Sequence, residues 1–379
     1  MSHASPVILF NTRLTGTRGV RLTRHAFAAR RGRNLAAACL ALLLSGCTNI
    51  GYYLQSVSGQ LDVWRRERAI EEVISDPAAP APLKKKLAQA LQIRDFASRE
   101  LGLPQNHSYR RYADLERPFV VWNVFAAPEF SVEPVQWCFM FAGCVSYRGY
   151  FDKSDADRFA ADAAREGHDV FIGGVPAYST LGWFSDPVLN TFIRYPDPEV
   201  ARLIFHELAH QVVYVRDDSV FNESFAVVVE QEGVRRWLAL HGGTQDQASF
   251  ERMQQYREGF TRLIGSYRER LDALYRSRLA PGVMRERKAQ LFDALGRDYE
   301  NLKAGWGGFG GYDRWFAQKP NNAQIASLAI YTQQVPAFQA LLRQQGGELA
   351  RFYAAVKELA ALPKEGRTAR LRQLAAQLL

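Results

Sequence analysis

Two histidines four residues apart, with a glutamate directly after the first, constrain this chain more than any other feature. They lie in the segment HELAH, which begins at His206 and ends at His210 and has the pattern HExxH. The preceding residues 200–205 are apolar or helix-forming, which predicts a helix around the motif. On a helix, residues four apart lie one turn above each other, so both imidazoles can hold one metal ion. Glu207 lies about 100° further round the helix and can reach a water on that metal instead.

A third metal ligand is available in the next predicted helix. Glu223 stands near the start of a helix predicted over residues 219–240, with Asp218 or Ser219 as its N-cap. Two helices joined by a turn at 216–218 can face each other and place Glu223 opposite the histidine pair. Three protein ligands and one water form the open tetrahedral site of a catalytic zinc ion, so we expect one Zn²⁺. The alternative is a structural helix with a solvated face of acidic and histidine side chains.

The segment HELAHQ followed by NESFA resembles the gluzincin metallopeptidases, whose aminopeptidases carry a HELAHQ-type sequence and then NEGFA. The resemblance implies that Glu223 is the third zinc ligand and that Glu230, seven residues later, supports the ligands. Because Glu230 lies two turns along the same helix face, it can bond a ligand histidine. Its alternative is a solvated surface carboxylate. Twelve residues separate His210 from Glu223, fewer than in the well-known gluzincins, which implies a short interhelical turn and a divergent branch.

The wider chain resembles the bacterial family of predicted aminopeptidase lipoproteins. The resemblance runs from LSGC at 44–47 through CVSYRGYF at 144–151 and AYSTLGWF at 177–184 to NNA at 321–323. It covers nearly all of the chain that would remain after a signal is removed. The expected fold class is α+β: a mainly helical, gluzincin-like (zincin) metallopeptidase fold with a small β-sheet.

Residues 1–46 have the features of a secretory signal. They contain seven arginines and no acidic residue, then an apolar run at 35–44 that is too short to span a bilayer. LSGC resembles the lipobox of bacterial lipoproteins, which implies that Cys47 is acylated and anchors the protein in the cell envelope. Thr48 after that cysteine implies the periplasmic face of the outer membrane. The alternative is a buried apolar helix that contains Cys47.

The net charge of +9 does not indicate a nucleic-acid partner. When the seven arginines of the signal are subtracted from +9, only +2 is left for the rest of the chain. So small a charge steers no polyanion strongly. The expected partners are a peptide substrate and a membrane, the latter through the lipid on Cys47.

The remaining two cysteines are expected to form a disulfide. Cys138 and Cys144 are close in sequence and have no further Cys or His nearby that would complete a zinc site. In an oxidising periplasm such a pair closes a small loop. The alternative is two buried thiols.

The pattern of apolar residues divides the chain into an N-terminal attachment and a catalytic unit. A helix is predicted over residues 50–75 and another over 83–101, with a proline-rich break between them. Short β-branched and aromatic runs then predict a small sheet, and beyond Pro198 helical periodicity predominates. The predicted parts are a signal peptide at 1–46, an anchored helix and linker at 47–82, and a catalytic unit at 83–379, with its sheet in 119–184 and its helices in 198–379.

A peptidase needs a β edge that holds its substrate extended. The segment GGVPAY, which includes Gly173, Gly174, Ala177 and Tyr178, lies shortly before the zinc helix, where gluzincins place that strand. Its glycines would allow close backbone approach, and Pro176 suits an edge because it cannot donate to a ladder. The alternative is an ordinary sheet edge.

Three further residues are candidates for substrate contacts. Tyr331, on a predicted helix about a hundred residues after the metal ligands, is our candidate hydrogen-bond donor to the oxyanion. Asn321 and Asn322 can bind polar groups of the substrate, or they can cap that helix.

These features predict a zinc-dependent peptidase, with an aminopeptidase acting on short peptides as the leading interpretation. The first alternative is an endopeptidase that acts on envelope proteins. The second is a non-catalytic lipoprotein in which the metal helices form a scaffold for partner proteins. Glu207 argues against the scaffold, because a purely structural site needs no general base.

Overall fold

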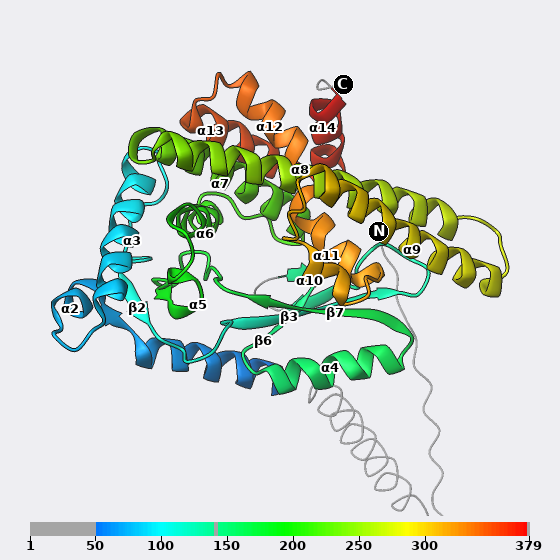
Figure 1. Ribbon diagram of the computed structural model, residues 1–379, viewed down its shortest axis with the longest axis horizontal. Helices are drawn as coiled ribbons and strands as arrows, with labels where there is room; N and C mark the ends of the chain where they lie inside the picture. Colours follow the sequence, from blue (N-terminus) through cyan, green and yellow to red (C-terminus); the bar gives the residue numbers. More distant parts are fainter. Residues whose placement is uncertain (1–50, 140–142, 377–379) are drawn as a thin grey trace, which may run out of the picture. The chain divides into compact units, whose positions relative to one another are not determined.

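A computed structural model describes residues 51–139 and 143–376 (Figure 1). The chain divides after Leu54, and the helices and strands described below lie in the second unit, Gln55–Leu379. Cys47 and the predicted signal lie outside the described residues. Among the described helices, none is long and apolar enough to cross a membrane.

The second unit combines small sheets with many helices, as expected of an α+β protein. Residues 55–66 are helical. The strands are β1 (Arg68–Ala69), β2 (Arg111–Ala113), β3 (Val121–Pro128), β4 (Trp137–Phe139), β5 (Gly143–Val145), β6 (Arg148–Tyr150), β7 (His168–Val175) and β8 (Val188–Leu189). The helices are α2 (Ile70–Ser75), α3 (Ala81–Arg99), α4 (Lys153–Arg165), α5 (Asn190–Ile193), α6 (Asp197–Ala209), α7 (Ser219–His241), α8 (Thr244–Tyr275), α9 (Pro281–Gly305), α10 (Asp313–Ala317), α11 (Asn322–Thr332), α12 (Val335–Gln344), α13 (Leu349–Ala360) and α14 (Lys364–Ala376).

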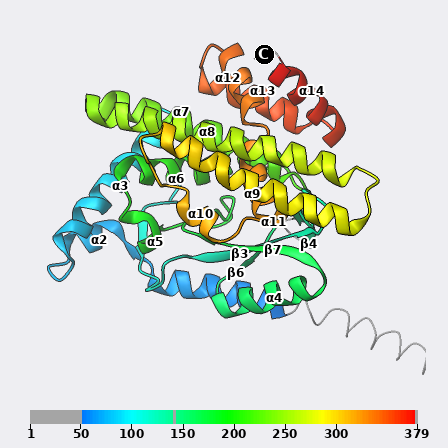
Figure 2. The ribbon, with the colours of Figure 1, turned by 45° about the vertical axis from the view of Figure 1, so that its right-hand side comes forward.

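The main sheet has the order β6-β3-β7, with both pairings antiparallel. β7 is therefore an edge strand, as its sequence predicts, and Asn123 of β3 pairs with Gly173 of β7. Helix α4 packs against one face of the sheet and α11 against the other (Figures 1 and 2). Because β3 is buried along most of its length, its sequence is a nearly continuous apolar run.

The helix predicted over residues 50–75 is wrong in its middle. The chain becomes extended at β1, which pairs with β2, and the Ile70 N–H donates to the Arg110 carbonyl at 3.2 Å. Backbone groups that a continuous helix would satisfy internally are thus bonded to a neighbouring strand. Helical periodicity alone gave no sign of this, because the strand is only two residues long.

Helices α6 and α7 pack against each other at the centre of the unit (Figure 1). Pro198 lies in the first turn of α6, where a backbone N–H would have no partner inside the helix, so its absence costs nothing. The negative charges of Asp197 and Glu199 stabilise the same end of α6, because the helix dipole is positive there. Helix α7 begins at the predicted N-cap, Asp218, whose carboxylate accepts from the Phe221 N–H. Helical periodicity in the sequence predicts a helix over residues 199–214, but α6 ends at Ala209, because the next N–H groups donate three residues back in a tighter turn.

A buried arginine on α3 organises the loop that reaches the end of α6. Arg94 is fully buried and donates to the carbonyls of Pro104, Asn106 and Ser108 at 2.7 to 3.1 Å. Burial, reinforced by the charge of Arg110, lowers the pKa of Arg94 to about 10. The Asn106 amide in turn donates to the side chain of Gln211, the residue after His210, at 2.7 Å. Arg94 therefore connects the core of α3 to the end of the HExxH segment.

We predict that Arg94→Met lowers the free energy of unfolding by about 3 kcal/mol, because several buried carbonyls lose their donor. Urea unfolding followed by circular dichroism measures the loss. Arg99→Met, an exposed position on the same helix, is the matched control and should change stability by less than about 0.5 kcal/mol. Equal stabilities of the two variants would contradict the role of Arg94.

Candidate metal centre

His206, His210 and Glu223 meet between α6 and α7, as their spacing predicts. One ligand atom from each lies within 4.8 Å of the others, and all three residues are buried. The Nε2 atom of His206 is 3.1 Å from Oε2 of Glu223, and Nε2 of His210 is 3.5 Å from the same oxygen. The two imidazoles thus converge on one carboxylate oxygen. This is the arrangement that the sequence required for a shared ion.

The amide of Asn222 holds the chain just before Glu223. Its Oδ1 accepts from the Val215 N–H at 2.7 Å, and its Nδ2 donates to the Val215 carbonyl at 2.8 Å. Asn222 thereby closes the turn between α6 and α7. This explains chemically why an asparagine stands directly before the ligand glutamate.

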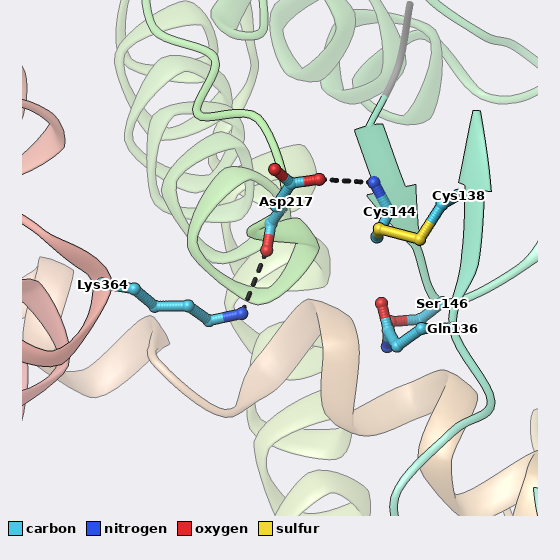
Figure 3. The surroundings of a disulfide bond; sticks show 6 residues. All are labelled: Gln136, Cys138, Cys144, Ser146, Asp217 and Lys364. Carbon is cyan, nitrogen blue, oxygen red and sulfur yellow. Dashed lines mark hydrogen bonds between the residues drawn. A yellow bond between two sulfur atoms is a disulfide. The ribbon is translucent and has the colours of Figure 1, made fainter. Parts of the chain in front are cut away.

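The same turn is held from two sides by residues distant in sequence (Figure 3). The carboxylate of Asp217 accepts from the Cys144 N–H at 2.5 Å, and its carbonyl accepts from Lys364 at 3.0 Å. Next to it, Arg367 of α14 donates to Asp218 through two nitrogens, at 2.7 and 3.0 Å. Sequence reasoning missed these contacts, because only the fold brings α14 to the turn.

Cys138 and Cys144 form a disulfide across the β4–β5 pair (Figure 3). The predicted bridge is therefore present and the alternative of two free thiols is wrong. The bridge fixes the hairpin whose backbone bonds the turn between the two ligand helices.

Glu230 lies behind the ligands and bonds one of them. Its Oε2 is 2.8 Å from Nδ1 of His206, and the residue is only 5% exposed. The solvated-carboxylate alternative is therefore wrong. The Arg202 side chain, one turn before His206 on α6, also bonds both oxygens of Glu230. Glu230 thus connects α7 to α6 through a ligand histidine and an arginine.

The hydrogen bonds of His206 show that the group fits a cation. Because Glu230 accepts from Nδ1 of His206, the lone pair of that imidazole lies on Nε2, which faces the Glu223 carboxylate. Two electron-rich atoms so close need a proton or a metal ion between them. Burial lowers the pKa of His206, but its bonds to Glu223 and Glu230 raise it to about 10 overall, so a proton occupies this position when no metal does.

The charge of the surrounding residues also fits a divalent cation. Four buried or half-buried carboxylates lie in this network, and two guanidinium groups compensate them in part; the carboxylates are Glu199, Glu207, Glu223 and Glu230, and the guanidinium groups belong to Arg202 and Arg257. With both histidines neutral, two negative charges remain. A cation of charge +2 would neutralise the network. Two imidazole nitrogens and one carboxylate form a donor set that suits zinc.

Glu207 stands beside the ligands. It is 8% exposed, and burial is the main reason that its pKa is raised. The nearby imidazoles of His206 and His210 oppose that rise. A carboxylate whose pKa is raised is better matched to proton transfer near neutral pH.

Tyr331 of α11 lies next to the same group. Its ring centroid is 6.4 Å from that of His206. Burial, together with the charge of Glu223, raises the pKa of Tyr331 well above its usual value. The hydroxyl therefore stays protonated and can donate a hydrogen bond at any ordinary pH.

Only part of the segment predicted to hold the substrate forms a strand edge. Gly173 and Gly174 lie in β7, whereas Ala177 and Tyr178 follow its end. Ala177 is buried in the main core, and the Tyr178 hydroxyl donates to Gln60 at 2.5 Å. A side chain at Gly174 would collide with the ring of Phe119, so packing inside the protein already requires this glycine. The backbone of β7 remains the candidate for holding a peptide.

Asn321 caps α11 as the alternative predicted, whereas Asn322 is the first residue of the helix and bonds the end of β3. Asn321 is the N-cap of α11, where its side chain accepts from the Gln324 N–H at 3.1 Å. Asn322 is fully buried and donates to the carbonyls of Pro128 and Glu129. Both side chains are committed to placing α11 on the sheet, and α11 carries Tyr331.

Asp186 is a buried carboxylate that the sequence did not single out. It is 3% exposed and accepts from the Thr180 N–H. Burial raises the pKa of Asp186 to about 7, and the charge of Glu207 adds to the rise. The Tyr109 N–H donates to its backbone carbonyl at 2.6 Å. A lone aspartate in the loop over residues 176–187 gave no sequence signal of this burial.

A family model described as "Putative aminopeptidase" matches residues 51–371 of the chain. The match includes every residue of the candidate metal centre. Neither a curated protein nor a solved structure matches the chain.

We predict that the buried Asp186 makes stability depend on pH. Its folded pKa of about 7 lies above the ordinary 3.8, so the folded state keeps a proton that the unfolded state releases above that value. Stability is therefore lost as pH rises from about 4 to 7, by up to about 1.4 kcal/mol per pH unit. The difference in unfolding free energy between the wild type and Asp186→Asn should shrink over that range. A difference for Asp186→Asn that stays constant over this range would refute the assignment.

Proposed function

Because the chain belongs to the family described as "Putative aminopeptidase", we propose that it is a zinc-dependent peptidase of the gluzincin type. His206, His210 and Glu223 hold one Zn²⁺ ion, and Glu207 is the general base. The observation that carries the proposal is the convergence of both Nε2 atoms on Glu223, with Glu207 buried beside them.

When it is bound, zinc acts as a Lewis acid that polarises the peptide carbonyl and lowers the pKa of water. Glu207 accepts a proton from the attacking water on its carboxylate and passes it to the leaving nitrogen. Tyr331 donates a hydrogen bond to the oxygen that becomes negative. Glu230 holds His206 so that Nε2 presents its lone pair to the metal.

The proposed substrate is a short peptide, cleaved from its N-terminus and bound in extended form along the edge of β7. Gly173 and Gly174 offer backbone groups there, and Ala177 and Tyr178 follow the end of the strand. An endopeptidase that cleaves envelope proteins is the alternative within the same chemistry. The family description favours the aminopeptidase.

We further propose that the protein is lipid-anchored through Cys47 at the periplasmic face of the outer membrane. The lipobox-like LSGC and the disulfide Cys138–Cys144 support an oxidising envelope compartment. No nucleic-acid partner is proposed.

A non-catalytic scaffold stabilised by zinc is the competing function of a different class. It would need the ligands but neither Glu207 nor Tyr331. A substitution that removes the general base while it leaves the ligands intact separates the two functions.

We predict that Glu207→Gln reduces kcat for peptide hydrolysis by about 10² to 10⁴, because general-base catalysis contributes on that order. Bound zinc and thermal stability should stay at wild-type levels, as measured by metal analysis and differential scanning calorimetry. Asp197→Asn, on the same helix but half-exposed, is the matched control and should retain full activity. An active Glu207→Gln variant would rule out the assigned base.

Metal removal tests the cofactor and the mode of cleavage together. We predict that the purified protein contains about one zinc per chain. A chelator should abolish hydrolysis, and stoichiometric Zn²⁺ should restore it. An aminopeptidase cleaves peptides with a free N-terminus and not their N-acetylated forms, whereas an endopeptidase cleaves both. A protein that binds zinc tightly but hydrolyses neither set would support the scaffold.

A further inference from the structure

An unbroken series of ionic contacts runs outward from the ligand His206 to a helix that supplies no ligand. Nδ1 of His206 bonds Glu230 at 2.8 Å, and Glu230 bonds Arg202 at 3.2 and 3.3 Å. Arg202 bonds Glu199 at 2.8 Å, and Glu199 bonds Arg257 of α8 at 2.5 Å. The series alternates in charge at every step.

The geometry of α6 explains how the series is built. Glu199, Arg202 and His206 are spaced by three and four residues, so they lie on one face of the helix. Glu230 joins this face from α7, and Arg257 joins it from α8. Three helices therefore meet along a line of charged groups that ends at the ligand histidine.

Arg202 is the central member of the series. Its Nε atom donates to Glu199 while another nitrogen of the same planar group donates to both oxygens of Glu230. Only a guanidinium can hold two carboxylates in fixed directions in this way, because a lysine ammonium is a single flexible point donor. The Arg202 side chain is 26% exposed and that of Glu230 is 7% exposed, so the contact with Glu230 is largely shielded from water.

We propose that Arg202 is a positioning residue of the metal centre and that Glu199 and Arg257 hold it in place. Arg202 fixes the Glu230 carboxylate, and Glu230 fixes the ring of His206 and the nitrogen that carries its proton. Helix α8 thereby contributes to metal affinity without supplying a ligand. This inference rests on the proposed metal function.

Arg202→Lys is the decisive variant because it keeps the positive charge but removes the planar group that bonds Glu199 and Glu230 at the same time. Its electrostatic effect on a bound cation is unchanged, so a loss of affinity reports lost positioning. We expect the Kd for Zn²⁺, measured by competition with a chromophoric chelator, to rise about tenfold, at the lower end of the range for groups behind metal ligands. The visible spectrum of the Co²⁺-substituted protein should change as well. Arg235→Lys, which replaces an exposed arginine paired with Glu232 on α7, should match the wild type in both measurements.

Stability measurements distinguish a positioning role of Arg202 from a role in holding the helices together. If Arg202 only holds the helices together, its replacement lowers the Tm of the metal-free and the zinc-loaded protein equally. If Arg202 positions the metal ligands, its replacement also reduces the rise in Tm on zinc binding. Wild-type zinc affinity and an unchanged Co²⁺ spectrum in Arg202→Lys would overturn the inference.

Glu199→Gln is a second variant in case Arg202→Lys fails to fold. It removes the negative charge that links Arg202 to Arg257 of α8. The Kd for Zn²⁺ should rise by about threefold, less than in the Arg202 variant, because Glu199 is farther from His206. An unchanged Kd in this variant would equally overturn the inference. If the wild-type protein binds no zinc, the proposed function fails. If the wild type binds zinc and the variants bind it equally well, only the positioning role fails.

Discussion

Two imidazole nitrogens and a carboxylate oxygen that face one another inside a protein repel each other unless a proton or a metal ion lies among them. This constraint governs the centre of the structure, because α6 and α7 pack so that His206, His210 and Glu223 converge. Burying the group makes the repulsion stronger, since little water screens it. Arg202 on α6 and Arg257 on α8 neutralise part of the negative charge of the surrounding carboxylates. A divalent cation would neutralise the rest.

Such a group must also be held rigidly, since a ligand that moves by a fraction of an ångström loses the ion. The short turn between the ligand helices is therefore fixed from several directions. Asn222 closes it from within, the disulfide hairpin bonds Asp217, and Arg367 of α14 bonds the helix cap Asp218. Arg94 orders the loop that contacts Gln211 at the other end of the motif. These contacts join parts of the chain up to 149 residues apart around one turn.

Two further groups, Tyr331 and Asp186, lie close to the metal group and to Glu207. Tyr331 lies beside His206, and the buried Asp186 is close enough to Glu207 that each charge affects the other. Burial keeps the Tyr331 hydroxyl protonated and raises the pKa of Glu207, so the group has a hydrogen-bond donor and a carboxylate beside it. Membership of a family described as "Putative aminopeptidase" and a buried group of His206, His210 and Glu223 that could hold a metal ion are both consistent with a peptidase.

The sequence alone predicted the convergence of His206, His210 and Glu223, the start of α7 at Asp218 or Ser219, the edge strand β7 and the disulfide. Each depends on residues close together in the chain or on a short spacing between helical turns, where geometry follows from periodicity. The sequence did not determine the strand that interrupts the helix at Arg68, the early end of α6, or the bonds by which Asn322 fixes α11 to the sheet. It also gave no sign of Asp217, Arg367, Asp186 or the series from Arg202 to Arg257. These depend on contacts between distant elements, and an isolated charged residue has the same local pattern whether it faces water or a partner. Only the packing of helices and strands decides which charges are buried and which group each one bonds.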